Sequence, residues 1–292
     1  MSQAHRHTID LVTAPILSHE RFDGEQYLLR VQAPEIAATA RAGSFVHITV
    51  DPQRPLRRPI SIMRVDKQAG WVEFLYKVFG EGTKLLAQRQ VGEKLSILGP
   101  IGTPFTAHME RRRPLLIGGG VGMPPMIFIA DELRVMKGIY EPFVILGSEV
   151  PFPFKARPSQ IMLPGVPSGV TAAMPLLEDW RIASRLASRQ GYAGCFDGFV
   201  TDLARTWLDA LTAAQRNEVE VFACGPHPML EAVAKLARDY NLPCQVSMEE
   251  FMACGVGGCA GCVVEVQTDK GTAMKRVCVD GPVFDARSVF PG

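Results

Sequence analysis

Four cysteines near the C-terminus constrain the fold of this 292-residue chain more than any other feature. Three closely spaced thiolates completed by a distant fourth are the ligand pattern of plant-type [2Fe–2S] proteins. Glycines between them would let a short loop wrap closely around an inorganic core and aim amide hydrogens at the sulfurs. The spacing is C-x4-C-x2-C-x15-C, formed by Cys254, Cys259, Cys262 and Cys278.

Zinc is the alternative, because four cysteines can also form a structural zinc site. Zinc ribbons usually pair two short C-x2-4-C knuckles, whereas Cys278 has no second knuckle beside it. The spacing therefore favours an iron–sulfur cluster over zinc or redox-inert cysteines. Cys195, Cys224 and Cys244 are scattered singly, which is typical of reduced thiols in a cytoplasm rather than of a disulfide framework.

Length and charge exclude several classes of protein. A chain of 292 residues is too long for most single cores, so two or three domains are expected. The net charge is +1 without a basic block, which gives no support for binding nucleic acid or an anionic membrane. Residues 1–10 lack the apolar run of a secretion signal, and glycines and prolines interrupt the apolar segment 114–130. We therefore expect a cytoplasmic protein.

The sequence divides into three predicted domains. Residues 1–110 contain short, partly β-branched runs separated by turns, which predict a small antiparallel β-barrel. Residues 111–245 alternate apolar strands with helices, which predicts a doubly wound parallel sheet. Within that domain, 151–175 holds six prolines and is expected to be a long loop. Residues 246–292 form a small cysteine-bearing module.

Two glycine-containing turns follow predicted strands of the parallel sheet. Glycines after a strand and before a helix let the backbone approach a pyrophosphate at the helix N-terminus, although G-G-G-x-G-x-x-P departs from the common dinucleotide fingerprint. Loops at strand C-termini line the ligand crevice of such sheets. These turns give the candidate nucleotide-binding residues Gly118, Gly119, Gly120 and Gly122 in the first turn, and Cys224, Gly225 and Pro226 in the second.

Two strings in the barrel region are also candidates for cofactor binding. An arginine beside a proline-fixed backbone can bind phosphate with two hydrogen bonds, and a glycine turn with a hydroxyl can hold another phosphate oxygen. A nearby serine could hydrogen-bond a ring nitrogen. The strings contribute Arg58, Pro59, Ile60 and Ser61, and then Lys77, Gly80, Gly82 and Thr83.

Taken in order, these motifs resemble the ferredoxin–NADP reductase superfamily. The tail, from Glu250 to Cys259 and from Arg276 to Phe284, resembles more specifically the electron-transfer subunit of class 1B dihydroorotate dehydrogenases. The resemblance implies an FAD-binding barrel, an NAD(P)-binding domain and a C-terminal [2Fe–2S] module.

The resemblance also assigns roles to residues. It implies that Arg58 meets the FAD phosphates and Ser61 the isoalloxazine edge. Gly82 and Thr83 would hold the pyrophosphate, while Gly119, Gly120 and Cys224 would face the nicotinamide nucleotide. Ile60 stands where many relatives have an aromatic residue that stacks on flavin, so aliphatic contact is expected there. Glu149 would accept from a ribose hydroxyl and favour NADH, unless Arg157 folds back to reverse that preference.

The function expected from these parts is electron transfer between NAD(H) and a partner redox subunit, in a hetero-oligomer. The resemblance implies a dihydroorotate dehydrogenase catalytic subunit as partner, and hence a role in pyrimidine biosynthesis. No acid–base pair is expected in this chain, because the substrate chemistry lies with the partner. Two alternatives remain: the reductase subunit of another redox complex, such as a hydrogenase or sulfur reductase, or a non-catalytic nucleotide-binding protein with structural zinc.

Overall fold

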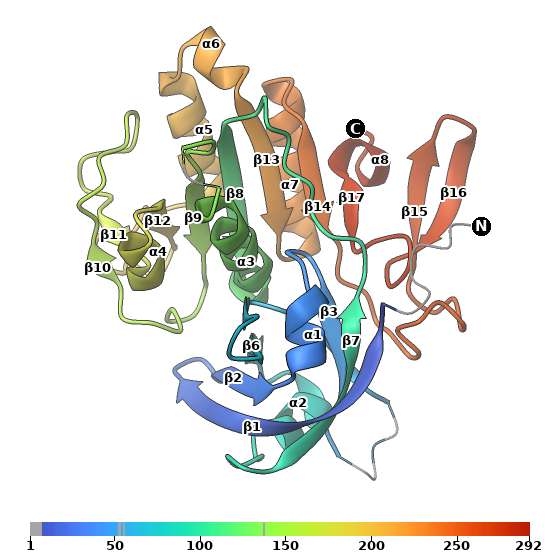
Figure 1. The fold of residues 1–292 in the computed structure, drawn as a ribbon. Helices are drawn as coiled ribbons and strands as arrows, with labels where there is room; N and C mark the ends of the chain where they lie inside the picture. Colours follow the sequence, from blue (N-terminus) through green and yellow to red (C-terminus); the bar gives the residue numbers. More distant parts are fainter. Residues whose placement is uncertain (1–7, 52–53, 55, 137) are drawn as a thin grey trace.

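The structure, a computed structural model, describes residues 8–51, 54, 56–136 and 138–292. Two large sheets and a small C-terminal module make up the molecule (Figure 1). Residues 1–7, which make up most of the polar N-terminal segment, lie outside the described residues. The fold class expected from the sequence, an antiparallel barrel followed by a parallel sheet, is confirmed by this arrangement.

The first sheet is antiparallel, with its strands in the order β4-β3-β7-β1-β2-β6-β5. Only Ile62 and Met63 join the edge strands β4 and β5, and their amides donate to the carbonyls of Ser44 and Glu73. The sheet therefore curls back on itself as a small barrel. Its strands are β1 (Asp10–Phe22), β2 (Gln26–Gln32), β3 (Phe45–Thr49), β4 (Arg58–Ser61), β5 (Arg64–Asp66), β6 (Trp71–Lys77) and β7 (Lys94–Ile101).

Side-chain alternation explains how these strands form a barrel. In β7 every second residue is buried, because successive side chains of a strand point to opposite faces. A bulge between Ile16 and Ser18 lets the long strand β1 pair with β7 along one part and with β2 along another. Two short helices, α1 (Pro34–Thr39) and α2 (Gly80–Leu86), connect the strands.

The second sheet has the order β12-β9-β8-β13-β14-β17, and all its pairs are parallel except the last. Helices α5 and α7 pack against each other on one face, while α3 covers the other face and contacts strand β5 of the barrel. This is the expected doubly wound arrangement. Its elements are β8 (Arg113–Gly119), η1 (Gly120–Gly122), α3 (Met123–Arg134), β9 (Phe143–Gly147), β12 (Ala183–Ala187), α5 (Val200–Ala210), α6 (Ala213–Arg216), β13 (Val219–Cys224), α7 (His227–Asp239) and β14 (Cys244–Ser247).

The proline-rich segment 151–175 is mostly irregular, as expected, but it contains a minimal two-strand ladder. Strand β10 (Arg157–Pro158) pairs with β11 (Ala172–Ala173), and α4 (Pro175–Asp179) follows. The prediction of a loop without elements was therefore wrong for these few residues. Prolines restrict such pairing because they lack an amide donor.

The C-terminal module consists of the cysteine loop (residues 249–262), a hairpin and a final strand and helix. The hairpin pairs β15 (Val263–Thr268) with β16 (Gly271–Arg276), and α8 (Ala286–Val289) ends the described elements. Strand β17 (Val283–Asp285) pairs antiparallel with β14 and so extends the second sheet. The predicted domain boundary at 245/246 falls inside β14 and stays a prediction.

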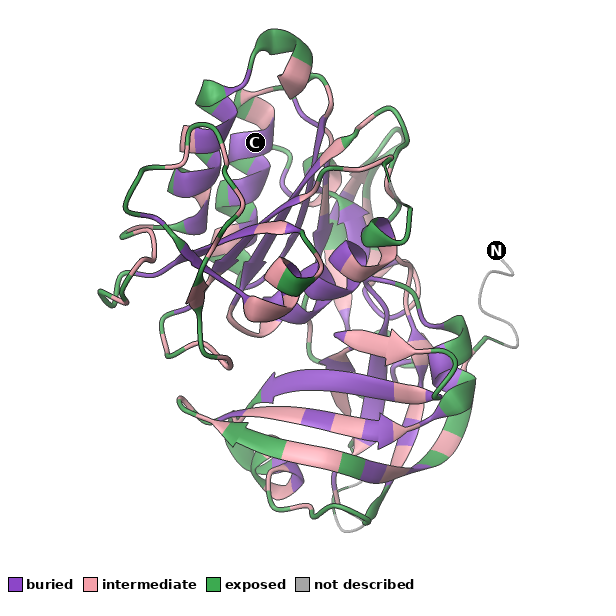
Figure 2. Cartoon of the chain, turned by 60° about the vertical axis from the view of Figure 1, so that its left-hand side comes forward, coloured by how far each residue is buried: buried purple, intermediate pink, exposed green. Residues whose placement is uncertain are grey.

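Buried residues are concentrated in the strands of the two large sheets and in the helix faces packed against them (Figure 2). One core cluster joins the barrel interior to α3, and the second joins α5 and α7 to the C-terminal module. Phe105 and Phe222 meet edge to face at 5.7 Å between ring centroids, linking barrel and sheet. Burying one such side chain contributes about 1.5–3 kcal/mol, so the three parts stabilise one another.

Candidate functional site

The two candidate strings of the barrel lie against each other. A Cβ atom on Gly82 would lie 2.1 Å from Nε of Arg58, so only glycine allows the guanidinium to lie over the start of α2. One Arg58 nitrogen donates to the carbonyl of Leu56 at 2.7 Å. Strand β4 and helix α2 therefore form one surface, with a guanidinium beside backbone amides. Such donors suit a pyrophosphate.

The other candidate residues of the barrel lie on β4, β6 and α2. The hydroxyl of Thr83 accepts from the Phe79 amide at 2.6 Å and holds the turn that precedes α2. Lys77 is exposed at the end of β6, and Gly80 leaves open space where a side chain would stand. On β4, Ile60 is buried, whereas its neighbours Pro59 and Ser61 are half-buried.

The glycine turn and the second nucleotide loop pack backbone against backbone. A Cβ on Gly122 would lie 2.2 Å from the carbonyl oxygen of Cys224, and one on Gly119 would lie 2.4 Å from the sulfur of Met229. Gly120 has φ of +55° and open space around its Cα. The backbone of this turn is therefore accessible on the side that Gly120 presents. Gly118, Gly225 and Pro226 complete the paired loops.

Cys224 itself is fully buried at the end of β13. Burial raises the pKa of its thiol well above the usual range, and the nearby Glu249 adds to this shift. The thiol is therefore protonated at neutral pH and lies in the core between sheet and barrel. The role expected for Cys224 toward a nicotinamide stays a prediction, with the side chain covered in this structure.

Residues that follow strands β9 and β12 lie at the sheet edge where selection between NADH and NADPH is expected. Parallel pairing of Ala187 with Gly147 brings the two strand ends together, and Ser188 donates to the carbonyl of Ser148 at 2.7 Å. Glu149 is exposed at this edge. Arg157, the residue expected to reverse its effect, instead forms an ion pair with Asp179 at 2.5 Å.

Sequence reasoning did not single out Arg189, which follows β12 at the same edge. Its guanidinium carbon lies 5.2 Å from the Phe199 ring. The rule that strand C-termini line the ligand crevice could have found it, once β12 was placed beside β9. The structure thus sets one acidic and one basic side chain, Glu149 and Arg189, at one edge.

The four cysteines approach each other in two pairs. The sulfur atoms of Cys262 and Cys278 are 3.3 Å apart. Cys254 and Cys259 also interact through their side chains, and backbone amides lower the pKa of the Cys254 thiol to about 7 despite an opposing effect of burial. Cys278 is buried with Cys262 as neighbour, which raises its pKa to about 12.

These four thiols lie near one another, as the ligands of a [2Fe–2S] cluster would. Two thiols for each of two irons are the protein ligands of a [2Fe–2S] cluster, whereas structural zinc needs all its ligands around one point. Amides of Val256 and Gly261 donate to the sulfurs of Cys254 and Cys259 at 3.5 and 3.4 Å. Within the described ranges, no three or more His, Cys, Asp or Glu side chains converge on a single metal position.

The segment around Cys278 is hydrogen-bonded to the cysteine loop. Arg276 donates to the carbonyl of Gly257 at 3.1 Å, and its amide donates to the carboxylate of Asp280 at 2.8 Å. The Val277 amide donates to the carbonyl of Cys262 at 2.8 Å. These bonds fix the fourth cysteine, Cys278, beside the loop that carries the other three.

His47 is a buried polar residue that sequence reasoning left without a role. It lies on β3, is fully buried, and neither ring nitrogen has a hydrogen-bond partner within the described part of the chain. Burial lowers its pKa to about 4, and the positive charges of Arg57 and Arg58 add to the shift, whereas the nearby backbone of Cys254 opposes it. Its Nδ1 would lie 2.7 Å from a Cβ on Gly255, so the ring is packed against the cysteine loop.

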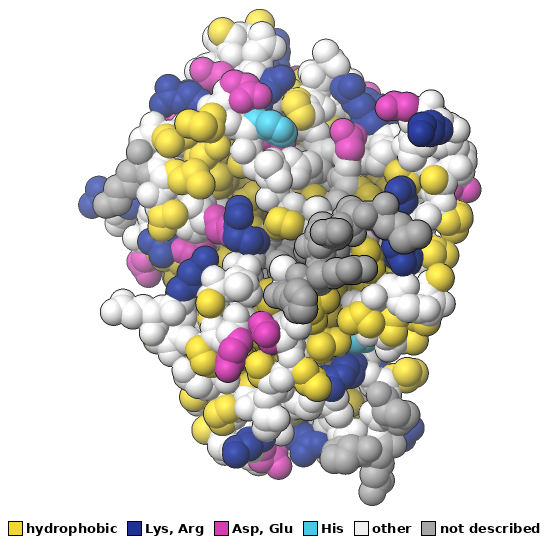
Figure 3. Space-filling model, turned by 45° about the vertical axis from the view of Figure 1, so that its right-hand side comes forward, with side chains coloured by type: hydrophobic (Ala, Val, Ile, Leu, Met, Phe, Trp, Pro, Cys, Tyr) yellow, Lys and Arg dark blue, Asp and Glu magenta, His cyan; other side chains and the backbone are white. Residues whose placement is uncertain are grey.

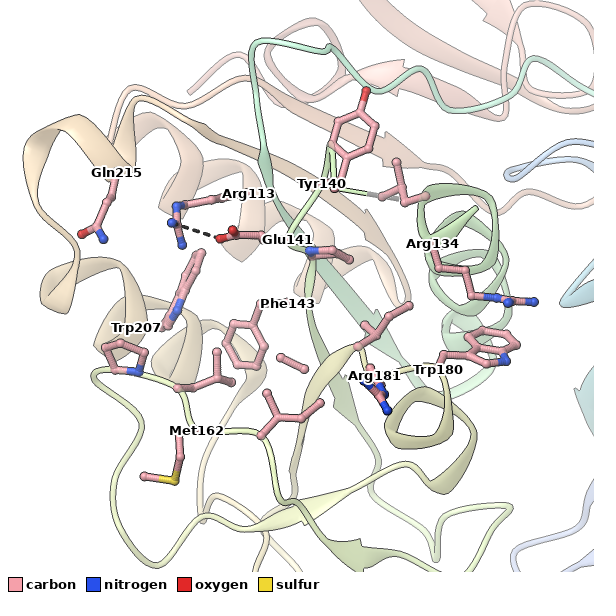
Figure 4. Close-up of a pocket in the computed structure, with 18 of the residues that line it drawn as sticks. Arg113, Arg134, Tyr140, Glu141, Phe143, Met162, Trp180, Arg181, Trp207 and Gln215 are labelled. Carbon is pink, nitrogen blue, oxygen red and sulfur yellow. Dashed lines mark ion pairs between the residues drawn. The ribbon is translucent and has the colours of Figure 1, made fainter. Parts of the chain in front are cut away.

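A cavity of about 560 Å³ lies where the strands of the parallel sheet begin, at the opposite end of the sheet from the glycine turn and the Cys224 loop. Arg113, Phe143 and Ala183, at the starts of β8, β9 and β12, line it together with residues 161–164 of the proline-rich segment. Figure 4 shows Arg113 and Glu141 joined by an ion pair of 3.0 Å on one side of the cavity. The cavity does not contain any of the predicted cofactor residues.

Helices of the described residues are all too short or too polar to cross a membrane.

Family comparisons match two parts of the chain. Residues 10–105 match the oxidoreductase FAD-binding domain, and residues 249–290 match the iron–sulfur cluster binding domain of dihydroorotate dehydrogenase B. The first range covers the barrel, and the second covers the cysteine loop, hairpin and β17. These matches confirm the predicted FAD-binding and iron–sulfur modules and favour iron–sulfur over zinc.

Among solved structures, the fold is similar to an NADH-dependent reduced ferredoxin–NADP oxidoreductase. The TM-score is 0.76 at 23% identity, over 95% of this chain and 90% of the other. Phthalate dioxygenase reductase is also similar, with a TM-score of 0.57 at 16% identity, over 91% of this chain and 76% of the other. These likenesses confirm the reductase-like fold.

Several curated relatives that match nearly the whole chain carry the name dihydroorotate dehydrogenase B (NAD(+)), electron transfer subunit. The protein of Caldanaerobacter subterraneus is 32% identical over 95% of this chain and 97% of its own. That of Bacillus caldolyticus is 35% identical over 90% of this chain and 92% of its own. The chain therefore belongs to the family of electron-transfer subunits of dihydroorotate dehydrogenase B.

Proposed function

We propose that this chain carries electrons between a dihydroorotate dehydrogenase catalytic subunit and NAD(H), through FAD and a [2Fe–2S] cluster. The proposal depends mainly on one observation: relatives of that name match the chain over nearly its whole length. Three further features support it: a phosphate-binding surface on the barrel, paired glycine loops on the sheet, and thiols arranged for a two-iron cluster. The role in pyrimidine biosynthesis follows from the partner.

The roles of the barrel residues are part of the proposal. Arg58, with the amides of Gly82 and the turn held by Thr83, would hold the FAD pyrophosphate. Ile60 and Ser61 on β4 would meet the isoalloxazine, Ile60 by aliphatic contact. Lys77, Pro59 and Gly80 are the further barrel residues proposed for this site. No residue of this chain acts as an acid or base on dihydroorotate, because that chemistry belongs to the partner.

The other proposed residues bind the nicotinamide nucleotide and the cluster. The open side of Gly120, with Gly118, Gly119 and Gly122, would receive the nicotinamide nucleotide beside the loop from Cys224 to Pro226. The cluster ligands would be the two cysteine pairs described above. When bound, FAD accepts hydride from a nicotinamide and exchanges single electrons with an iron–sulfur cluster, so it links two-electron and one-electron chemistry.

NADH is the proposed coenzyme, and the cytoplasm the proposed location. Glu149 is exposed at the sheet edge, where its carboxylate would accept from a ribose hydroxyl and repel a 2′-phosphate. Arg157 does not oppose it, because Asp179 pairs with this arginine. Reduced cysteines outside the cluster loop support a cytoplasmic location.

Reconstitution with a catalytic subunit tests the proposal. The chain is coexpressed with a dihydroorotate dehydrogenase catalytic subunit, and the copurified complex is assayed for dihydroorotate-dependent reduction of NAD and of NADP. We expect a stable complex that reduces NAD faster than NADP, by about tenfold if one charge-assisted contact decides the preference. A chain that reduces dyes with NADH but never forms this complex would instead serve another redox enzyme.

A further inference from the structure

His47 lies between the proposed flavin-binding strand and the cluster loop. On one side, its register partner on β4 is Pro59, the residue next to Arg58. On the other side, its ring packs against Gly255, the residue next to Cys254. Gly255 has φ of +69°, and a side chain there would collide with the ring. His47 therefore pairs with the proposed flavin-binding strand through its backbone and packs against the cluster loop through its ring.

Both ring nitrogens of His47 are buried without a hydrogen-bond partner within the described residues. A neutral imidazole carries one N–H donor and one bare acceptor nitrogen, and buried polar groups almost always find partners. The other histidine of the barrel illustrates the rule, because His19 bonds the Tyr76 hydroxyl at 2.8 Å and the Arg89 carbonyl at 2.9 Å. The backbone of Cys254 lies near enough to the ring to oppose the lowering of the His47 pKa, so the cluster loop can supply the missing partner.

We infer that His47 is a positioning residue, which donates a hydrogen bond to the cluster loop at Cys254 when the cluster is bound. This bond would seat the first cluster ligand against strand β3, which pairs with the proposed flavin-binding strand β4, and so fix the cluster relative to the flavin. Hydrogen bonds near the sulfurs also stabilise the reduced cluster and raise its potential. The inference rests on the proposed function, since it requires both cofactors.

Replacement of His47 in the full chain tests this role. His47→Phe keeps a planar ring without a donor, and His47→Gln restores an N–H; His19→Phe is the matched control in the same barrel. Each variant is analysed for FAD and iron content, for the midpoint potential and electron paramagnetic resonance spectrum of the cluster, and for the rate at which NADH reduces the flavin.

The inference predicts a specific pattern. His47→Phe shifts the cluster spectrum and weakens its reduction about tenfold, which is about 59 mV for one electron, while NADH still reduces the flavin at the rate of the unchanged protein. His47→Gln restores most of the potential, and His19→Phe leaves it unchanged. Loss of iron alone from His47→Phe would also support the inference.

Two outcomes would overturn it. A cluster of unchanged potential and spectrum in His47→Phe would make the histidine an ordinary core residue. Loss of both FAD and iron would assign it to folding of the barrel. Neither result bears on the proposed function, which is tested separately by complex formation with the catalytic subunit and by the FAD and iron content of the unchanged protein.

Discussion

At the scale of single residues, two glycines of one turn have opposite roles. Gly122 is needed for packing, because a Cβ there would meet the Cys224 carbonyl at 2.2 Å. Gly120 has positive φ and open space beside it, which leaves its backbone open to the nucleotide in the proposed function. The G-G-G-x-G-x-x-P spacing predicted both glycines as nucleotide-binding candidates. It could not distinguish them, because their difference depends on a loop about a hundred residues away.

Alanine at these two positions should therefore act differently. Gly122→Ala forces the paired loops apart and should destabilise the protein by about 1–3 kcal/mol or more, as overpacking does. Gly120→Ala meets no other atom and should cost only the strain of the left-handed backbone, about 1–2 kcal/mol. Urea unfolding of both variants measures the difference. Equal losses of stability would show that the close approach of Gly122 to Cys224 is not essential.

Arg58 should govern FAD affinity rather than stability. Loss of a charge-assisted bond to phosphate removes about 1.5–3 kcal/mol, so Arg58→Ala should weaken FAD binding by roughly 10- to 100-fold. The control is Arg21→Ala, which removes an exposed arginine that pairs with Glu25 on the hairpin between β1 and β2. Fluorescence titration of the apoprotein with FAD measures both. Unchanged affinity in Arg58→Ala would remove this residue from the proposed site.

The contact of His47 with the cysteine loop could not be predicted from the sequence. Cysteine spacing predicts ligands because thiolate chemistry is visible in the residue type itself. A histidine without ligand spacing gives no such signal, and only the fold brings His47 of β3 against Gly255 of the cysteine loop. Cys224 illustrates the converse, since the resemblance places it facing the nicotinamide nucleotide, a prediction that stands beside a thiol fully buried in this structure.

At the scale of elements, one buried arginine ties the proline-rich segment to the parallel sheet. Arg185 on β12 is 5% exposed and donates to the carbonyls of Val170 and Ile161 at 2.9 and 2.8 Å, and to that of Ser184. Burial lowers its pKa, although Glu178 opposes the shift. Composition predicted an irregular segment here. It could not predict this attachment, because β12 had not been identified as a strand.

Removal of this arginine should release the segment. Arg185→Met keeps the apolar stem but leaves the carbonyls of Val170 and Ile161 without their donor, at a cost of about 1–3 kcal/mol. We expect faster limited proteolysis within residues 159–171. The control is Arg157→Met, which loses a more exposed pair with Asp179 and should change cleavage less. Identical cleavage of Arg185→Met and the unchanged protein would contradict this account.

At the scale of the whole molecule, the C-terminal module is built into both other parts. Strand β17 extends the parallel sheet, and the Thr103 amide of the barrel region donates to the Gly281 carbonyl at 2.6 Å. The sequence predicted the fold class: a barrel, a parallel sheet and a small cysteine-bearing module, in that order. It could not predict that the last one shares a sheet with the second, because strand register depends on tertiary contacts.

The cluster loop also presents apolar side chains outward. Phe251 is 89% exposed and Val256 is 49% exposed, beside the exposed Cys259. Figure 3 shows hydrophobic side chains gathered over the part of the surface that this module forms. Exposed aromatic residues are typical anchors of protein interfaces, so this face is expected to meet the catalytic subunit.

Phe251→Ser should therefore weaken the complex. Loss of an interface anchor costs about 2 kcal/mol, which is roughly 30-fold in affinity for the catalytic subunit. FAD and iron content should remain unchanged. The matched control is Met162→Ser, which removes an equally exposed apolar residue of the proline-rich segment, 91% exposed. Calorimetry of each variant with the catalytic subunit measures the effect; equal affinities would move the interface elsewhere.

Anaerobic titration of the purified chain with NADH tests the central claim most directly. The visible spectrum follows FAD, electron paramagnetic resonance follows the cluster, and metal analysis counts iron and zinc. The account predicts one FAD and two irons per chain, loss of the flavin absorbance on addition of NADH, and a reduced [2Fe–2S] signal in the same sample. A colourless protein that holds one zinc and no flavin would contradict it.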